Sequence, residues 1–158
     1  MNKIAIGEKA PNFSLSDQTG KIHQLSDYQG KWLLLYFYPK DNTPGCTVEA
    51  CSLRDSWADF DKLNANILGV SADSVASHQK FADKFNLSFP ILADETKEMI
   101  KSYGVLAEKS MFGKKFLGIK RSSFLIDPDG KIAKIYEKVK PVGHAKEVLE
   151  NLQKLIAQ

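Results

Sequence analysis

The sequence lacks any long apolar run. Its longest, Trp32–Tyr38, has seven residues, whereas a membrane-spanning helix needs about 20. The first residues, Met1–Glu8, also lack the apolar core of a signal peptide. We therefore expect a cytoplasmic location and no membrane partner.

Clusters of charge of one sign are missing as well. The chain has 22 basic and 19 acidic residues, and its lysine-rich tracts are short and interrupted. Nucleic-acid-binding proteins usually gather their basic residues into a continuous stripe, so we expect no nucleic-acid partner. Internal repeats, low-complexity tracts and linker-like segments are also missing. We therefore expect one domain over residues 1–158, long enough to bury a substantial core.

Cysteine is rare. Cys46 and Cys51 are the only two in the chain, and they lie five positions apart. In a reducing cytosol, such a close pair is more typical of a catalytic, redox-sensing or metal-binding site than of a permanent disulfide.

Apolar strands alternate with helices along the chain. Trp32–Tyr38 is continuously apolar or aromatic, as in a strand covered on both faces. The predicted helices cover about 44–63, 74–85, 96–103 and 145–156; the predicted extended segments cover 32–38, 66–71, 89–92, 123–127 and 132–136. Residues 12–15 and 22–25 flank a turn and predict an N-terminal hairpin. This order indicates an α/β fold, a three-layer sandwich with a mixed central sheet; the thioredoxin-like fold is one example.

Cys46 lies where a predicted helix begins. Thr43 followed by Pro44 is a helix-start signal, with threonine as the N-cap and proline at the first helical position. Cys46 then falls in the first turn, where free backbone N–H groups and the helix dipole favour an anion. A thiol so placed can have its pKa lowered from about 8.5 towards the range of about 3.5–7.5. The position suits a nucleophile, although a small buried structural cysteine is the simpler alternative.

Cys51 lies in the same predicted helix. Five helical residues rise about 7.5 Å and rotate about 140°, which places the two Cα atoms roughly 8–9 Å apart. A disulfide tolerates at most about 7 Å without backbone movement. A Cys46–Cys51 bond would therefore require the first helical turns to unwind, and Gly45 weakens the helix there by about 1 kcal/mol relative to alanine. Otherwise, Cys51 is a buried structural thiol.

These residues carry a family resemblance. Pro39, Thr43 and Cys46 match the P-x-x-x-T-x-x-C signature of peroxiredoxins. The longer string Phe37–Cys51 closely resembles the bacterioferritin comigratory protein, or Q-type, branch. The similarity extends over nearly the whole chain, including Arg121–Asp127.

The resemblance implies a thioredoxin-like fold and reduction of hydrogen peroxide or organic hydroperoxides for antioxidant defence, without a cofactor. Cys46 would be the peroxidatic nucleophile and become a sulfenic acid. Cys51 would be the resolving cysteine and form an intramolecular disulfide, which thioredoxin or a similar dithiol would reduce. Thr43 would hydrogen-bond the peroxide and thiolate, Pro39 would shield the site, and Arg121 would supply a fixed positive charge.

The positions of the two cysteines restrict the mechanism by which a sulfenic acid could be resolved. No cysteine lies in the C-terminal third, so resolution by a partner's C-terminal thiol is excluded, and we expect a monomer. Glu49 also matches the family string, but a helical glutamate is more often solvated, so its role stays open.

The strongest alternative is a metal-binding protein of the same fold that carries copper on Cys46, Cys51 and His144. The other histidines, His23 and His78, are expected at the surface. A dithiol oxidoreductase is a second alternative, but it would normally carry Cys-x-x-Cys.

Overall fold

The computed structural model describes residues 4–158 and has a mixed central sheet of five strands in the order β5-β4-β3-β8-β9. β3, β4 and β5 are mutually parallel, whereas β8 runs antiparallel to β3 and β9. The strand bounds are Trp32–Phe37 (β3), Ala65–Ser71 (β4), Ile91–Ala93 (β5), Ser122–Ile126 (β8) and Ile132–Tyr136 (β9).

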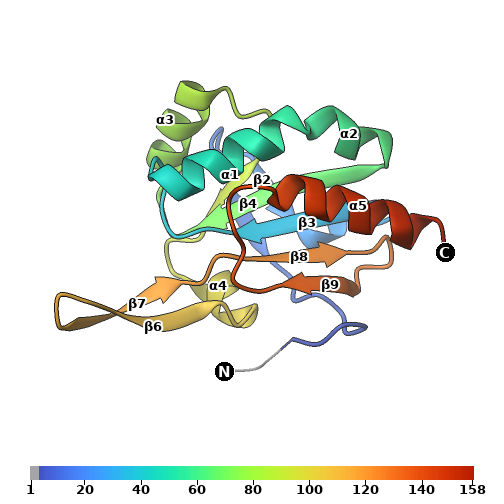
Figure 1. Cartoon of the computed structure of the whole chain (residues 1–158). Helices are drawn as coiled ribbons and strands as arrows, with labels where there is room; N and C mark the ends of the chain where they lie inside the picture. The colour runs from blue at the N-terminus through green and yellow to red at the C-terminus, as the bar shows by residue number, and fades with distance from the viewer. Residues whose placement is uncertain (1–3) are drawn as a thin grey trace.

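Helices cover both faces of this sheet, so the molecule has three layers (Figure 1). One face packs against α1, α2, α3 and α5, and the other packs against α4 and the N-terminal segment. The helix bounds are Pro44–Asp55 (α1), Trp57–Lys62 (α2), Val75–Phe85 (α3), Glu98–Ser102 (α4) and His144–Ile156 (α5). The predicted α/β sandwich is confirmed.

β3 is the central strand, and its apolar sequence explains why. Successive side chains of a strand point to opposite faces, so Leu34 and Tyr36 enter one core while Leu33, Leu35 and Phe37 enter the other. All five side chains are almost fully buried. A strand with apolar side chains on both faces lies between two packed layers. The carboxyl end of β3 is therefore buried, and a short loop connects it to α1, which carries Cys46.

The predicted helix over 44–63 is two helices that meet at Ser56. The N–H of Ser56 donates to the carbonyls of both Ser52 and Leu53, and its backbone leaves the helical region at φ −94° and ψ 0°. α2 then begins at Trp57, and its Phe60 lies in the core beside β4. The N-terminal hairpin is confirmed as β1 (Ser14–Ser16) paired with β2 (Ile22–Gln24), followed by the short 3-10 helix η1 (Leu25–Tyr28).

A second hairpin, β6 (Leu106–Met111) paired with β7 (Lys114–Ile119), is not among the elements predicted from the sequence. It projects from the body of the molecule (Figure 1). Its turn consists of Phe112 and Gly113, both with positive φ (53° and 77°). Asparagine before glycine is the usual signal for such a turn, and here a phenylalanine that is 96% exposed takes its place.

Candidate active site

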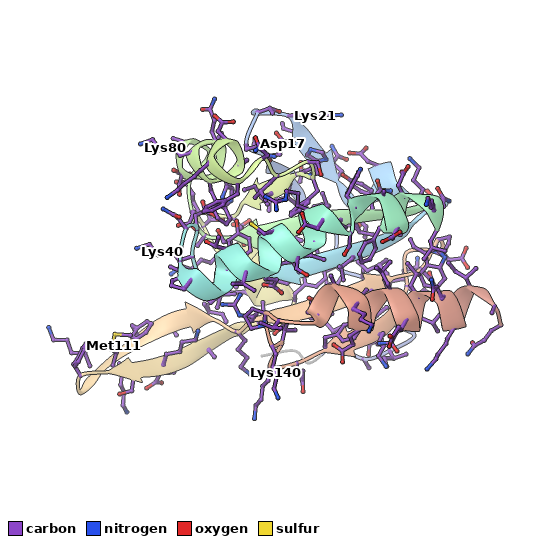
Figure 2. The ribbon with its side chains drawn as sticks, turned by 45° about the horizontal axis from the view of Figure 1, so that its top comes forward. Asp17, Lys21, Lys40, Lys80, Met111 and Lys140 are labelled. Carbon is purple, nitrogen blue, oxygen red and sulfur yellow. The ribbon has the colours of Figure 1, made fainter. Side chains whose placement is uncertain are left out.

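The candidate site lies where β3 passes into α1. Thr43 is the N-cap in an extended conformation and Pro44 opens the helix, so Cys46 occupies the first turn as expected. The cysteine is only 1% exposed. Figure 2 labels Lys40, which lies in the connecting loop beside the amino end of α1. The sheet therefore fixes one end of this loop, and the helix fixes the other.

Arg121 lies against the Cys46 thiol although 75 positions separate them in the sequence. β8 pairs with β3 so that Ser122 lies opposite Phe37, which brings the preceding arginine beside the start of α1. One guanidinium nitrogen, Nη2, is 3.4 Å from Cys46 Sγ, and the other, Nη1, donates to Glu49 Oε1 at 2.9 Å. The guanidinium thus bridges the thiol and a carboxylate.

Gly45 makes room for this bridge. A Cβ at position 45 would lie 3.0 Å from Arg121 Nη2 and 3.5 Å from the Cγ of Pro141. Contacts below about 3.4 Å are tighter than nearly all real Cβ contacts. Any side chain at position 45 would therefore press on the guanidinium that contacts the thiol.

Glu49, whose role the sequence leaves open, is buried, although a helical glutamate is more often solvated. Its side chain is 1% exposed, and its Oε2 has no hydrogen-bond partner within residues 4–158. Burial raises the pKa of Glu49 from 4.5 to about 7, and this exceeds the opposing effect of Arg121. The sequence held a signal for this position, because Glu49 is three positions after Cys46 and four before Leu53 and so shares the buried face of α1.

The Arg121 guanidinium is held in its charged form by both neighbours. Partial burial acts to lower its pKa, but the negative charges of Cys46 and Glu49 and the hydrogen bonds to them raise it above its ordinary value. An arginine that cannot lose its proton can provide a permanent cation beside a sulfur atom.

Thr43 and Pro39 lie in the segment that connects β3 to the first turn of α1. The Thr43 hydroxyl does not cap the helix, as the sequence had suggested, but donates to the Lys40 carbonyl at 2.8 Å. The oxygen of that hydroxyl remains free to accept a hydrogen bond. Pro39 is half-buried and lies one residue beyond Tyr38, which follows the end of β3.

Cys51 lies farther along the intact α1 helix. It is half-buried, and both cysteines are free thiols. Because the whole segment Pro44–Asp55 is helical, the rise of about 1.5 Å per residue keeps the two sulfur-bearing positions on different turns. The structure is therefore that of the protein with both thiols reduced.

The copper site suggested for Cys46, Cys51 and His144 is not assembled in this conformation. Both ring nitrogens of His144 are already engaged, Nε2 with Ser123 Oγ at 2.8 Å and Nδ1 with Glu147 Oε1 at 3.2 Å. Burial lowers the pKa of His144 more than Glu147 raises it. Within residues 4–158, the ligand atoms that approach one another within 4.8 Å belong to a different group, Asp41, Asp73 and His78.

The other two histidines are buried, so their expected surface position is wrong. His23 is 6% exposed, and its ring contacts Asp17 at 2.6 Å and Tyr28 at 2.7 Å. His78 is fully buried on α3. The sequence held a signal for this burial, because His78 is three positions from both Val75 and Phe81 and so shares the apolar face of the helix.

His78 joins a buried polar network that sequence reasoning missed. Its Nδ1 lies 2.7 Å from Asp41 Oδ2, and its Nε2 lies 2.9 Å from the Leu92 carbonyl. The Tyr38 hydroxyl donates to Asp41 Oδ1 at 2.6 Å, and the Asp41 N–H donates to Asp73 Oδ2 at 2.9 Å. The loop before Cys46 is therefore tied to the scaffold.

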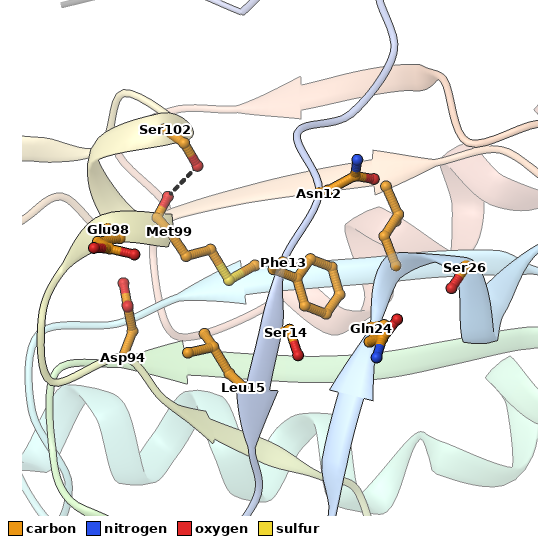
Figure 3. Close-up of a pocket in the computed structure, with 11 residues that line it drawn as sticks. Asn12, Phe13, Ser14, Leu15, Gln24, Ser26, Asp94, Glu98, Met99 and Ser102 are labelled. Atoms are coloured by element: carbon orange, nitrogen blue, oxygen red, sulfur yellow. Dashed lines mark hydrogen bonds between the residues drawn. The ribbon is translucent and has the colours of Figure 1, made fainter.

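A separate cavity of about 740 Å³ lies between the N-terminal hairpin and α4 (Figure 3). Phe13, Leu15 and Met99 form its apolar wall, and Asp94 and Glu98 lie at one side. None of the five predicted site residues lines it. None of the helices within residues 4–158 has the length and apolar character required to cross a membrane.

Known proteins are similar to this chain over most of its length. The model of the AhpC/TSA family matches residues 6–135. Peroxiredoxin Bcp of Bacillus subtilis is 48% identical over 95% of this chain and 96% of its own length, and that of Escherichia coli is 45% identical over 97% and 98%.

Solved structures of related proteins superpose closely on this chain. A cysteine-to-serine mutant of Xylella fastidiosa peroxiredoxin Q superposes with a TM-score of 0.93, at 40% identity over the full length of both chains. The bacterioferritin comigratory protein of Xanthomonas campestris, a structure described as giving insight into alkyl peroxide reduction, has a TM-score of 0.87 at 43% identity over 90% of this chain and 91% of its own. The chain therefore belongs to the AhpC/TSA family, in its peroxiredoxin Bcp or Q branch, and is a thiol peroxidase.

Proposed function

We propose that Cys46 is the peroxidatic nucleophile, Cys51 is the resolving thiol, and a thioredoxin-type dithiol completes the cycle. The observation that carries this proposal is the contact of 3.4 Å between Arg121 Nη2 and Cys46 Sγ at the first turn of α1. A guanidinium and a helix amino terminus both favour the thiolate, which is the reactive form of cysteine.

In the first step the Cys46 thiolate attacks one oxygen of the peroxide and the O–O bond breaks. Sulfur gains the S–OH bond of a sulfenic acid, and the other oxygen leaves as water or an alcohol after taking up a proton. Arg121 stabilises the charge that develops on the leaving oxygen. The Thr43 hydroxyl orients the peroxide, and Pro39 keeps water from the site.

In the second step the Cys51 thiol attacks the sulfenic sulfur of Cys46. The S–O bond breaks, a disulfide forms and water leaves. Since an intact helix holds the thiols too far apart, the first turns of α1 unwind. A dithiol protein then reduces the bond by exchange, and both cysteines return to thiols while the reductant is oxidised.

Glu49 serves as a positioning residue. Its carboxylate accepts from Arg121 Nη1 at 2.9 Å, so the guanidinium keeps its other nitrogen on the sulfur. A planar group held at two points is better oriented than a flexible cation held at one.

Intact mass and turnover together test the assignment. We would treat reduced wild type, Cys46→Ser and Cys51→Ser with about one equivalent of hydrogen peroxide, and follow turnover with thioredoxin. Wild type should lose two hydrogens, Cys46→Ser should not oxidise rapidly, and Cys51→Ser should accumulate the sulfenic acid with poor turnover. Undiminished peroxide consumption by Cys46→Ser would sink the proposal, as would stoichiometric copper binding without peroxidase activity.

We also propose that the chain acts as a cytoplasmic monomer, because resolution within one chain needs no partner thiol. Sedimentation velocity of the reduced and oxidised protein should give the mass of one chain, 17.6 kDa. A dimer in either state would count against it.

A further inference from the structure

We propose that the buried Asp41–His78 pair is a latch on the loop before Cys46, and that its strength sets how the oxidised enzyme divides between disulfide formation and over-oxidation. The second part rests on the resolving role proposed for Cys51. Neither residue touches the thiol, so both would act as positioning residues.

The latch ties the loop to elements that stay folded. Asp41 is five positions before Cys46 and two before the N-cap. Its Oδ1 accepts from Tyr38 at 2.6 Å, and its Oδ2 accepts from Ser77 at 2.8 Å and lies 2.7 Å from His78 Nδ1. Both carboxylate oxygens are therefore held, from the end of β3 and from α3.

The hydrogen atoms of His78 can be placed from its partners. The Leu92 carbonyl can only accept, so the Nε2 at 2.9 Å carries a hydrogen. A contact of 2.7 Å between Nδ1 and a carboxylate oxygen also needs a proton between them. The pair thus shares one proton in a site where His78 is fully buried and Asp41 is 8% exposed, which makes a charge-assisted hydrogen bond.

A further charged group that bonds this loop is Asp73, beyond the end of β4, whereas Lys80 and Lys84 line the pocket beside Asp41. The Oδ2 of Asp73 accepts from the Asp41 backbone N–H at 2.9 Å and from the Ser71 hydroxyl at 2.7 Å. It therefore holds the backbone of the same loop rather than competing for the His78 proton. Because these side chains donate to and accept from one another, they hold the loop in place and do not form an open ligand site.

Two reactions compete for the Cys46 sulfenic acid. In the folded pocket beside Arg121, a second peroxide molecule can transfer one oxygen to the sulfenic sulfur, which gives a sulfinic acid and water or an alcohol. Once α1 has unwound, the Cys51 thiol attacks the sulfenic sulfur of Cys46 instead, and a disulfide and water form. A latch that fixes the loop favours the folded pocket, and a weakened latch favours the disulfide.

Two substitutions of similar size distinguish the contribution of the Nδ1 contact with Asp41 from that of the Nε2 contact with the Leu92 carbonyl. His78→Gln keeps a donor towards the Leu92 carbonyl and loses the contact with Asp41. His78→Asn keeps a donor towards Asp41 and loses the contact with Leu92. We expect His78→Gln to lower the ratio of sulfinic acid to disulfide about tenfold at high peroxide, because one charge-assisted hydrogen bond is lost. His78→Asn should stay within about threefold of wild type.

Ser77→Ala is the milder variant if His78→Gln fails to fold. It removes one hydrogen bond to Asp41 Oδ2 and leaves the imidazole in place, so the ratio should fall in the same direction by about threefold. A general loss of thermal stability with an unchanged ratio in both Ser77→Ala and His78→Gln would overturn the proposed effect on partitioning.

Hydrogen exchange of the reduced protein tests the latch without relying on Cys51. Amides of residues 39–51 should exchange about tenfold faster in His78→Gln than in wild type, whereas those of α5 should not change. Equal exchange would overturn the latch even in a working peroxidase. If wild type forms no Cys46–Cys51 disulfide, the proposed function fails, and the exchange result still decides whether the latch exists.

Discussion

At the scale of single residues, the site depends on one guanidinium that serves two partners. Arg121 contacts Cys46 with Nη2 and Glu49 with Nη1. A lysine at this position would keep the charge but, as a point charge on a flexible stem, could not bridge both groups in a fixed geometry.

We therefore expect Arg121→Lys to lower kcat/KM for peroxide about 100-fold, comparable to the loss of one preorganised donor to a developing anion. Stopped-flow measurement of Cys46 oxidation checks this. Arg54→Lys is the matched control, because Arg54 bonds Asp55 and the Phe85 carbonyl instead of the thiol. An unchanged rate in Arg121→Lys would show that charge alone suffices.

Gly45→Ala should have opposite effects on the stability of the protein and on its peroxidase activity. Alanine favours a helix over glycine by up to about 1 kcal/mol, yet its Cβ would lie 3.0 Å from Arg121 Nη2. We expect an equal or higher Tm together with a loss of about tenfold in kcat/KM, since small displacements of a positioning group are costly to rate. Parallel losses of stability and rate would mean that the added methyl group disrupts the helix itself.

At the scale of elements, the proposed cycle requires an α1 helix that is stable enough to hold the thiolate and weak enough to open. The break between α1 and α2 at Ser56 would confine the proposed unwinding to a short segment. α2 packs beside β4 and belongs to the core through Phe60, so it has no need to move.

On oxidation, we expect residues 44–53 to lose helical structure while α5 keeps its own. Far-UV circular dichroism should show a small loss of helix, and hydrogen exchange should accelerate only around α1. Cys51→Ser, which cannot form the bond, should show neither change. Identical exchange in reduced and oxidised wild type would contradict the unwinding.

The sequence revealed those elements whose signals are local. The apolar run of β3 and the Thr43–Pro44 helix start both predicted what the structure has. The β6–β7 hairpin was missed because its exposed strands do not alternate apolar and polar residues, and Phe112 occupies the place of the usual turn residue. The ion pair of Glu49 could not be predicted because its partner is an arginine 72 positions away.

At the scale of the whole molecule, stability should fall with rising pH because of Glu49. Its pKa is about 7 when folded against an ordinary 4.5, so between these values the folded state binds more protons than the unfolded state. Stability contributed by the protonated form is fully present below about pH 4.5 and is lost as pH rises through 7.

Urea unfolding of the reduced protein at several pH values between 4.5 and 8 checks this. The decline attributable to Glu49 should be on the order of 3 kcal/mol, and Glu49→Gln should flatten that part of the profile. The comparison uses slopes, because the substitution also alters the contact with Arg121. Identical slopes would mean that Glu49 stays ionised throughout.

The 75 positions between Cys46 and Arg121 also separate the two groups in time while the protein is being made. At about 5–20 residues per second, the ribosome adds the arginine roughly 4–15 s after the cysteine. Until β8 pairs with β3, the nascent chain carries Cys46 without its guanidinium. If Arg121 activates Cys46 as proposed, an incomplete chain would meet cellular peroxide with a Cys46 thiol that lacks this activation, and the thiol would gain its reactivity only when the fold is complete.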